Sequence, residues 1–211
     1  MSDDSIHDIL ARAPVIPVIT IDDPDQALLL AEALLAGGLT VLEITLRTAR
    51  ALQIIDQIRD AFPDALVGAG TVLNPEQFMN AVDAGADFIV SPGFTEELLD
   101  CAFTQEQPFL PGVNTASEVM TLLAEGIDAM KFFPAEAAGG IALLKALAAP
   151  FPQALFCPTG GISPRNARDY LALPNVACIG GSWMVSPELL RAGRWEDIRM
   201  LAQDAANLRT V

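Results

Sequence analysis

The stretch AGGLTVLEI, residues 36–44, joins two kinds of structure: glycines that can end a helix are followed at once by an apolar strand. DAGADFIV at 83–90 and AEGIDAMKF at 124–132 repeat the same joint. Glycine is favoured just beyond a helix C-terminus because it adopts a left-handed backbone conformation without a Cβ clash. The repetition therefore predicts a series of equivalent helix–strand units.

Short apolar runs and longer amphipathic segments alternate along the whole chain. Eight strand–helix units at a spacing of about 20–26 residues are typical of a closed parallel barrel, so we predict an α/β fold, a TIM (β/α)8 barrel. An open doubly wound sheet is the alternative, but the strand count favours the barrel. We expect a single barrel domain over 1–211, with 1–12 as an N-terminal helical extension. The strands are expected at 15–20, 40–46, 65–70, 86–91, 108–112, 128–133, 154–158 and 175–180, and the helices at 24–36, 49–61, 75–84, 95–103, 116–124, 140–149, 164–171 and 195–208.

Composition and charge limit the classes of partner. The 211 residues are 52% hydrophobic and 18% charged, which suits one domain with a sizeable core. A net charge of -15 provides no basic surface for nucleic acid and would be repelled by an anionic membrane. The acidic opening MSDDSIHDIL is unlike a signal peptide, and no apolar run is long enough to span a bilayer. We therefore expect a soluble cytoplasmic protein that binds neither nucleic acid nor membrane.

Histidine and cysteine are too scarce for several common catalytic sites. His7 is the one histidine of the chain, and Cys101, Cys157 and Cys178 form no C-x-x-C pair. A zinc site built on several histidines, or a Ser-His-Asp triad, therefore has almost no material. We predict no metal site, and reduced thiols of the kind that cytosolic proteins keep.

Lys131 is the best candidate for a catalytic residue. The chain has two lysines, and the other, Lys145, lies on a helical pattern that is typical of a solvated surface lysine. Lys131 instead lies in the strand-like run AMKFFP at 129–134, which has no other polar side chain. Burial disfavours the ammonium form of lysine, and the neutral amine is the nucleophile that attacks a ketone. A structural lysine that leaves the strand end to meet a carboxylate is the alternative.

The second expected strand, VLEITLRT at 41–48, alternates polar and apolar side chains. Because side chains alternate across a strand, Glu43, Thr45 and Arg47 share one face. On a barrel strand this face would point into the lumen, where Glu43 could act as a general acid/base and Arg47 as an anion anchor. A solvent-exposed edge strand would give the same alternation.

Glycine-rich turns follow three other strands. Thr71 comes directly after Gly-Ala-Gly, where backbone and hydroxyl donors can meet a carboxylate. TGGISP at 159–164 and GGS at 180–182 follow the seventh and eighth strands, where this fold commonly binds phosphate. Pro164 is expected at the first position of the next helix. A purely structural role for these glycines is the alternative.

Taken together, these segments resemble the bacterial 2-keto-3-deoxy-6-phosphogluconate (KDPG) aldolase family, the class I aldolases of the Entner–Doudoroff route. The pair KFFPAE and PTGGI is highly specific, whereas GAGT alone is not. The matching stretches cover nearly the whole chain: PVIPVI, VLEITLRT, VGAGTVLNPEQ, VSPG, KFFPAEAAGG, FCPTGGISPRN and CIGGSW.

The resemblance implies a lyase of carbohydrate metabolism that cleaves KDPG to pyruvate and glyceraldehyde 3-phosphate through a Schiff base. It also implies a homotrimer and no cofactor. The family's Schiff-base lysine falls on Lys131 and its proton-transferring carboxylate on Glu43. The resemblance places the other roles as follows: substrate carboxylate binding on Arg47 and Thr71 beside Lys131, phosphate binding on Gly160, Gly161, Gly181 and Ser182, and the pocket lining on Phe133, Thr159 and Pro92.

Other functions stay open at this stage. The same chemistry would cleave 4-hydroxy-2-oxoglutarate (KHG) to pyruvate and glyoxylate, or the galactonate epimer of the sugar acid. A phosphate-binding barrel could also be an isomerase, in which Lys131 polarises a carbonyl without forming a covalent bond. A sugar-phosphate sensor on the same scaffold would need neither Lys131 nor Glu43 for binding.

Overall fold

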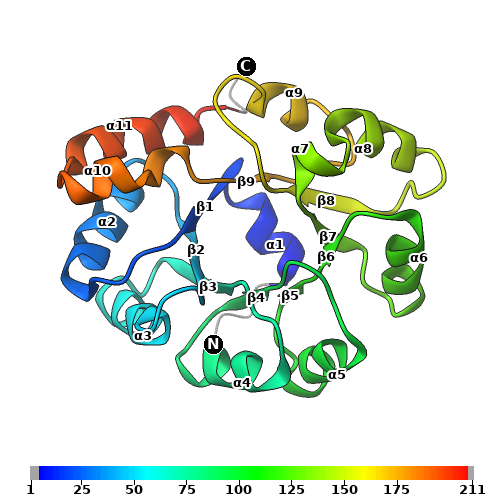
Figure 1. Ribbon diagram of the computed structural model, residues 1–211, viewed down its shortest axis with the longest axis horizontal. Coiled ribbons are helices and arrows are strands. Elements are labelled where there is room, and N and C mark those ends of the chain that lie inside the picture. The colour runs from blue at the N-terminus through cyan, green and yellow to red at the C-terminus, as the bar shows by residue number, and fades with distance from the viewer. Residues whose placement is uncertain (1–4, 209–211) are drawn as a thin grey trace.

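A computed structural model describes residues 5–208 as strands that alternate with helices (Figure 1). The strands are β1 (Val15–Ile19), β2 (Val41–Thr45), β3 (Leu66–Gly70), β4 (Phe88–Val90), β5 (Phe109–Leu110), β6 (Gly112–Val113), β7 (Ala129–Phe132), β8 (Leu155–Pro158) and β9 (Ile179–Gly181). The helices are α1 (Ile6–Ala11), α2 (Pro24–Ala36), α3 (Ala51–Ala61), α4 (Pro75–Asp83), α5 (Glu96–Gln105), α6 (Ala116–Ala124), α7 (Ala135–Ala138), α8 (Gly140–Ala148), α9 (Ala167–Leu171), the 3-10 turn η1 (Trp183–Val185), α10 (Pro187–Arg191) and α11 (Trp195–Ala206).

The strands of the described residues pair in parallel, in two sheets. One has the order β5-β4-β3-β2-β1-β9 and the other β6-β7-β8. Isolated parallel bridges, Phe156 to Val176 and Thr159 to Gly180, connect β8 with the segment that contains β9. The two sheets together curl into a ring, with α1 in the middle of the view and most of the other helices outside the strands (Figure 1). The α/β class and the parallel sheet are therefore confirmed.

The expected strand at 108–112 is split into β5 and β6 at Pro111. A proline has no N–H to donate to a neighbouring strand, so the ladder is interrupted there. The Pro111 carbonyl still accepts a hydrogen bond from the Lys131 N–H at 2.9 Å. The interruption therefore leaves β7, the strand that carries Lys131, attached to its neighbour.

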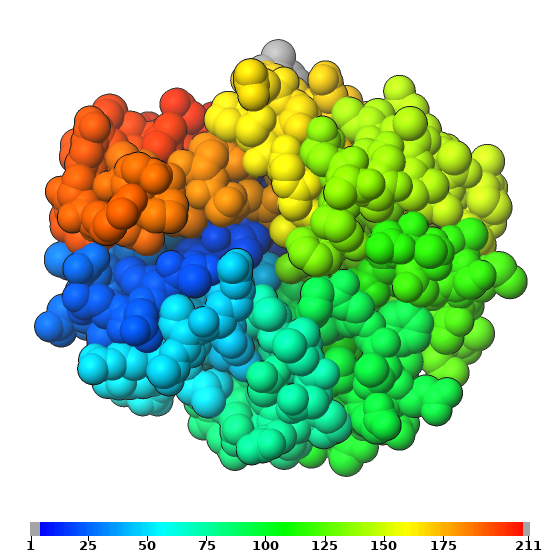
Figure 2. Space-filling view, in the orientation of Figure 1, coloured from blue at the N-terminus to red at the C-terminus, as the bar shows by residue number. Residues whose placement is uncertain are grey.

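Successive helix–strand units follow one another around the molecule, so that the C-terminal segments meet the N-terminal ones. Figure 2 shows the orange and red C-terminal segments against the blue N-terminal ones. At this junction α11 packs on α2. A Cβ added to Gly37, at the end of α2, would lie 2.5 Å from the Ala202 Cβ, so the close approach of α11 requires glycine there.

The strands separate two apolar clusters. Leu42, Ile44, Met130 and Phe132 belong to the outer cluster, which fills the space between strands and helices. The inner cluster instead combines α1 with side chains from the opposite strand faces: Ile9, Leu10, Ile16, Val41, Leu66, Phe88, Val90, Leu110, Ala129, Cys157 and Cys178. Because alternate residues of a strand face opposite sides, Lys131 faces the same side as Ala129, toward the interior.

Some sequence-based boundaries were wrong. The helix expected to begin at Pro164 begins at Ala167, because residues 164–166 form a turn in which Asn166 Oδ1 accepts the Ser163 N–H at 2.8 Å. Helices α7 and α10, of four and five residues, were not predicted. Within residues 5–208, no helix combines the length and apolar character needed to cross a bilayer.

Candidate active site

Lys131 and Glu43 meet inside the curled sheet, although β7 and β2 are not neighbouring strands. The Lys131 Nζ lies 3.1 Å from the Glu43 Oε1, and the two side chains are only 6% and 5% exposed. A buried ammonium or carboxylate is costly unless it is paired, and each of these groups satisfies the other. The contact places an amine and a proton acceptor within hydrogen-bond distance in a water-poor interior.

Backbone contacts on both sides of β7 hold Lys131 in place. It pairs with Gly112 of β6 and with Cys157 of β8. Its Nζ also lies 5.5 Å from the centre of the Phe133 ring, within the range of a cation–π contact. Phe133 is half-buried, so it forms a wall beside the amine.

Glu43 lies in a space that Gly70 leaves for it. A Cβ built on Gly70, in the neighbouring strand β3, would lie 2.2 Å from the Glu43 Oε1. The φ angle of Gly70 is not in the left-handed region, so this glycine is required for space rather than for backbone conformation. Any side chain at position 70 would displace the carboxylate from Lys131.

A hydroxyl pair that was not predicted lies near the carboxyl ends of β1 and β2. The Thr45 hydroxyl donates to the Ile19 carbonyl at 2.9 Å, and its oxygen is 2.9 Å from the Thr20 hydroxyl oxygen. Because the single proton of Thr45 is used on Ile19, Thr20 donates to Thr45. The Thr20 oxygen is then left with lone pairs that can accept a further hydrogen bond.

Arg47 and Thr71 lie beyond the strand ends, and neither forms a hydrogen bond or ion pair with Lys131 or Glu43. Arg47 is exposed, two residues past the end of β2, and no other described residue forms a hydrogen bond or ion pair with its guanidinium. Thr71 directly follows β3 with a φ of 60°, an uncommon value for a residue that is not glycine. Strained residues of this kind gather at functional sites. The cation that the sequence predicted as an anion anchor is thus available to a ligand.

The turn after β8 has backbone φ angles that favour glycine. Gly160 and Gly161 have φ angles of 103° and 79°, in the region that favours glycine. Thr159 is buried, and a Cβ on Gly180 would lie 2.2 Å from its hydroxyl oxygen, so β9 approaches β8 closely here. The two predicted phosphate turns are therefore neighbours in space.

The remaining predicted site residues lie at the end of β9 and in the loops that follow β9 and β4. Gly181 ends β9 and is buried under Trp183, whereas Ser182 is exposed. A Cβ on Gly181 would lie 2.1 Å from the Trp183 ring. Pro92 is half-buried after β4, and its carbonyl carbon lies 2.3 Å from where a Cβ on Gly112 would be. This places the Pro92 backbone next to β6, the strand that pairs with Lys131.

Known aldolases are similar to this chain over nearly its whole length. The model of the KDPG and KHG aldolase family matches residues 6–201. The KHG/KDPG aldolase of Escherichia coli (strain K12) is 51% identical over 201 residues, covering 95% of this chain and 94% of that protein. The 2-dehydro-3-deoxy-phosphogluconate aldolase of Dickeya dadantii is 50% identical over 201 residues, with the same coverage.

This chain belongs to the KDPG and KHG aldolase family.

A solved aldolase of this family has a very similar fold over nearly the whole chain. The KDPG aldolase of Legionella pneumophila, with pyruvate captured at low pH as a covalent carbinolamine intermediate, is 49% identical with a TM-score of 0.95. The alignment covers 97% of this chain and 100% of that one. The covalent intermediate is a property of that protein.

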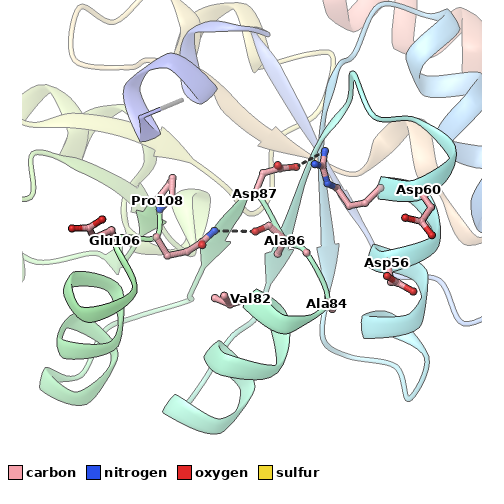
Figure 3. A pocket seen from close by; sticks show the side chains of 11 residues that line it. Asp56, Asp60, Val82, Ala84, Ala86, Asp87, Glu106 and Pro108 are labelled. Carbon is pink, nitrogen blue, oxygen red and sulfur yellow. Dashed lines mark hydrogen bonds and ion pairs between the residues drawn. The ribbon is translucent and has the colours of Figure 1, made fainter. Parts of the chain in front are cut away.

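A separate pocket of this aldolase lies at the amino-terminal ends of β4 and β5 (Figure 3), whereas Thr71, Pro92 and the glycine turns follow the carboxyl ends of their strands. It has a volume of about 270 Å³, and the carboxylates of Asp56, Asp60, Asp87 and Glu106 line it. Its one basic residue, Arg59, already bonds Asp87 at 3.0 Å and the Ala65 carbonyl at 2.7 Å. An anionic substrate would therefore be disfavoured in this pocket.

Proposed function

We propose that this chain is a class I aldolase that cleaves KDPG to pyruvate and glyceraldehyde 3-phosphate. The observation that carries the proposal is the buried contact of 3.1 Å between the Lys131 amine and the Glu43 carboxylate. An amine that forms a covalent intermediate with a ketone needs a neighbouring group to remove and return protons. Glu43 is the carboxylate within reach of Nζ.

The proposed reaction begins with transfer of a proton from Lys131 Nζ to Glu43. The neutral amine attacks the C2 ketone to give a carbinolamine, and Glu43 returns its proton to the carbinolamine hydroxyl, which leaves as water and gives an iminium. Glu43, directly or through a water, then takes the proton of the C4 hydroxyl as the C3–C4 bond breaks. The bond electrons move to the iminium, which becomes an enamine, and glyceraldehyde 3-phosphate leaves. Protonation at C3 and hydrolysis release pyruvate and restore the amine.

Substrate binding is assigned to the loops around this pair. We assign the carboxylate of the substrate to Arg47 and Thr71, because Arg47 is an uncommitted cation at the strand ends. The phosphate is assigned to the turns at Gly160, Gly161, Gly181 and Ser182, with Phe133, Thr159 and Pro92 lining the pocket. Local donors of this kind are needed to hold an anion against a net charge of -15.

KHG is proposed as a second substrate. It shares the 2-keto acid end with KDPG but has no phosphate, so it would use Lys131, Glu43 and Arg47 and leave the glycine turns empty. The name of the 51% identical Escherichia coli relative supports this broader range. The galactonate epimer and non-covalent isomerisation stay as alternatives that substrate comparison and iminium trapping distinguish.

We also infer the finer architecture. The two isolated bridges at β8 support one closed eight-stranded barrel, with β5 and β6 as one strand and α1 as an N-terminal helix that contributes to the interior. We infer a single domain over 1–211, a cytoplasmic homotrimer, and no nucleic-acid or membrane partner. Contact between subunits is supported by three large apolar side chains that are more than half exposed: Leu73 before α4, Phe103 in α5 and Met120 in α6.

Pyruvate release from KDPG tests the proposed function directly. In an assay coupled to lactate dehydrogenase, the wild-type protein should oxidise NADH when KDPG is added. Lys131→Ala should abolish this activity, while Lys145→Ala, which removes an exposed lysine on α8, should retain it. A wild-type protein without activity, or a Lys131→Ala variant with full activity, would contradict the proposal.

A further inference from the structure

Glu136 and Tyr170 form a contact that the proposed reaction does not use. Tyr170 lies in α9, its side chain is fully buried, and its hydroxyl donates a hydrogen bond to Glu136 Oε1. Glu136 lies in the short helix α7, five residues after Lys131, and its own side chain is exposed. The contact therefore joins the loop after β7 to the helix that follows β8.

The backbone beside Glu136 is attached to the glycine turn. The Glu136 N–H donates to the Gly160 carbonyl at 3.1 Å, and the Ala135 N–H donates to the Thr159 carbonyl at 2.8 Å. The Glu136 stem also covers Gly161, since a Cβ on that glycine would lie 2.5 Å from the Glu136 Cγ. Thus α7 packs directly on the turn that is proposed to bind phosphate.

These contacts set the direction of the N–H groups in the turn. A trans peptide unit is planar, with its carbonyl and the next N–H pointing in opposite directions. The carbonyls of Thr159 and Gly160 point to α7, so the N–H groups of Gly160 and Gly161 point away from it. Asn166 Nδ2 donates a hydrogen bond to the Gly161 carbonyl at 3.2 Å, which fixes the next peptide unit of the turn as well. A shift of α7 would therefore turn the donors that a phosphate needs.

Tyr170 is suited to hold α7 in place. Its desolvation, the hydrogen bond to Glu136 and the charge of that carboxylate all raise the pKa of the phenol, so it stays a proton donor throughout the neutral range. A Cβ on Gly140, whose φ is 57°, would lie 2.9 Å from the Tyr170 hydroxyl oxygen, so α8 also packs closely around the phenol. A buried ring with one fixed hydroxyl is a rigid attachment point for the exposed Glu136.

We propose that Glu136 and Tyr170 are positioning residues for the phosphate end of the substrate, through the hydrogen bond that fixes α7 against the Thr159–Gly161 turn. The inference rests on the proposed function. It assigns to this pair the preference for phosphorylated over unphosphorylated keto acids. Neither side chain takes part in the steps at Lys131.

The test compares a phosphorylated substrate with a ligand that has no phosphate. Glu136→Ala and Tyr170→Phe should each raise the KM for KDPG by about tenfold, with kcat little changed, because a hydrogen bond to a charged group is lost. The pyruvate concentration that half-saturates borohydride trapping at Lys131 should stay the same, since pyruvate does not reach the glycine turns. The double variant should resemble either single variant, because both remove one contact.

Two further variants separate the contact from general effects. Glu136→Gln keeps an oxygen that can accept the Tyr170 proton, so it should retain most of the wild-type KM. Glu125→Ala removes an exposed carboxylate at the end of α6 and should change nothing. Circular dichroism melting checks that each variant is folded; Glu136 is exposed, so its variants should fold even if Tyr170→Phe does not.

The outcomes are distinct for the inference and for the proposed function. An unchanged KM for KDPG in folded Glu136→Ala would overturn the inference, as would an equal loss of KDPG cleavage and pyruvate trapping. A Glu136→Gln variant as defective as Glu136→Ala would also overturn it. A wild-type protein that neither cleaves KDPG nor traps pyruvate would overturn the proposed function, and the inference with it.

Discussion

At the scale of single residues, the pairing of Lys131 with Glu43 matters more for chemistry than for stability. Removing two charged groups from water costs several kcal/mol per ion, and their attraction often only offsets that cost. Apolar side chains could fill the same interior, as they do at Ala129 two residues before Lys131. A buried amine–carboxylate pair is therefore best explained by the proton transfers of the proposed reaction.

Glu43→Gln should separate proton transfer from covalent bond formation. The amide keeps the shape of the side chain but cannot take a proton, so kcat for KDPG should fall by about 10²–10⁴. Adduct formation with pyruvate should be slower, because Glu43 no longer takes the Lys131 proton, but it should remain detectable by borohydride reduction after long incubation, because Lys131 is unchanged. Steady-state kinetics and mass spectrometry of the same preparation provide both measurements. Wild-type turnover in this variant would remove Glu43 from the mechanism.

Gly70→Ala tests whether the position of Glu43 depends on the lack of a side chain at residue 70. The added Cβ would lie 2.2 Å from Glu43 Oε1, so the carboxylate must move away from Lys131. A displacement of about 1 Å costs about 10²-fold in rate, and we expect a loss of that order in kcat. Gly85→Ala is the control for glycine loss in general, because open space surrounds its Cβ, although its φ of 80° costs some stability. A fully active Gly70→Ala variant would show that Glu43 has room elsewhere.

At the scale of elements, capping residues fix where a helix begins. The helix α6 begins with a capping box, in which Thr115 and Glu118 satisfy each other's backbone N–H groups. Burial raises the pKa of Glu118, but hydrogen bonds from the Asn114 N–H and from the hydroxyl and N–H of Thr115 outweigh it and lower the pKa below its ordinary 4.5. The ionised form is thus favoured by folding.

This shift gives a pH-dependent contribution to the free energy of unfolding. A carboxyl whose pKa is lower in the folded state stabilises the protein above its unfolded pKa and loses that contribution as pH falls through the folded pKa. The wild type should therefore be more stable than Glu118→Gln at neutral pH, and the difference should shrink below pH 4.5. Urea denaturation of both proteins at neutral and acid pH measures it. A difference that grew on acidification would contradict the assigned direction.

Leu10→Ala tests the contribution of α1. Leu10 is fully buried in the inner cluster, among side chains from several strands. Truncation of such a side chain should lower the free energy of unfolding by about 2–5 kcal/mol. The kcat per folded molecule should stay the same, because Leu10 takes part in none of the proposed steps. Urea denaturation and an activity assay on the folded fraction check the two parts, and an unchanged stability would mean that α1 does not close the interior.

How far the sequence predicts this architecture depends on the element. Long amphipathic helices such as α2 and α11 were found because their patterns span several turns. The short α7 was missed because four residues contain no helical period. Pro164 was wrongly placed at the start of α9 because the Ser163–Asn166 turn competes with the helix signal, and the break at Pro111 was overlooked although proline itself signals it.

The candidate site, too, was predictable from the sequence only in part. Lys131 and Glu43 could be identified because a charged side chain in an apolar strand is unusual, and their contact across 88 residues is now explicit. The contacts of Tyr170 with Glu136 and of Thr20 with Thr45 could not be predicted, because only tertiary packing decides which partner each hydroxyl meets. KFFPAE contains Glu136, but nothing in that motif points to a tyrosine in α9.

At the scale of the whole molecule, a strongly acidic protein is proposed to bind an anionic substrate and to assemble with itself. A net charge of -15 keeps molecules apart at long range, so association needs apolar contact. Leu73, Phe103 and Met120 are each more than half exposed, and we propose that they take part in such contacts. Sedimentation equilibrium should give a mass three times that of one chain. A monomer at micromolar concentration would contradict the homotrimer.

The most direct test of the central claim is to find the residue that bonds to pyruvate. The protein is incubated with pyruvate, reduced with borohydride, digested and analysed by mass spectrometry, with Lys131→Ala treated in parallel. We predict one adduct per chain on the peptide that contains Lys131, and none in the variant. An adduct on Lys145, or a wild-type protein that forms none, would contradict the account.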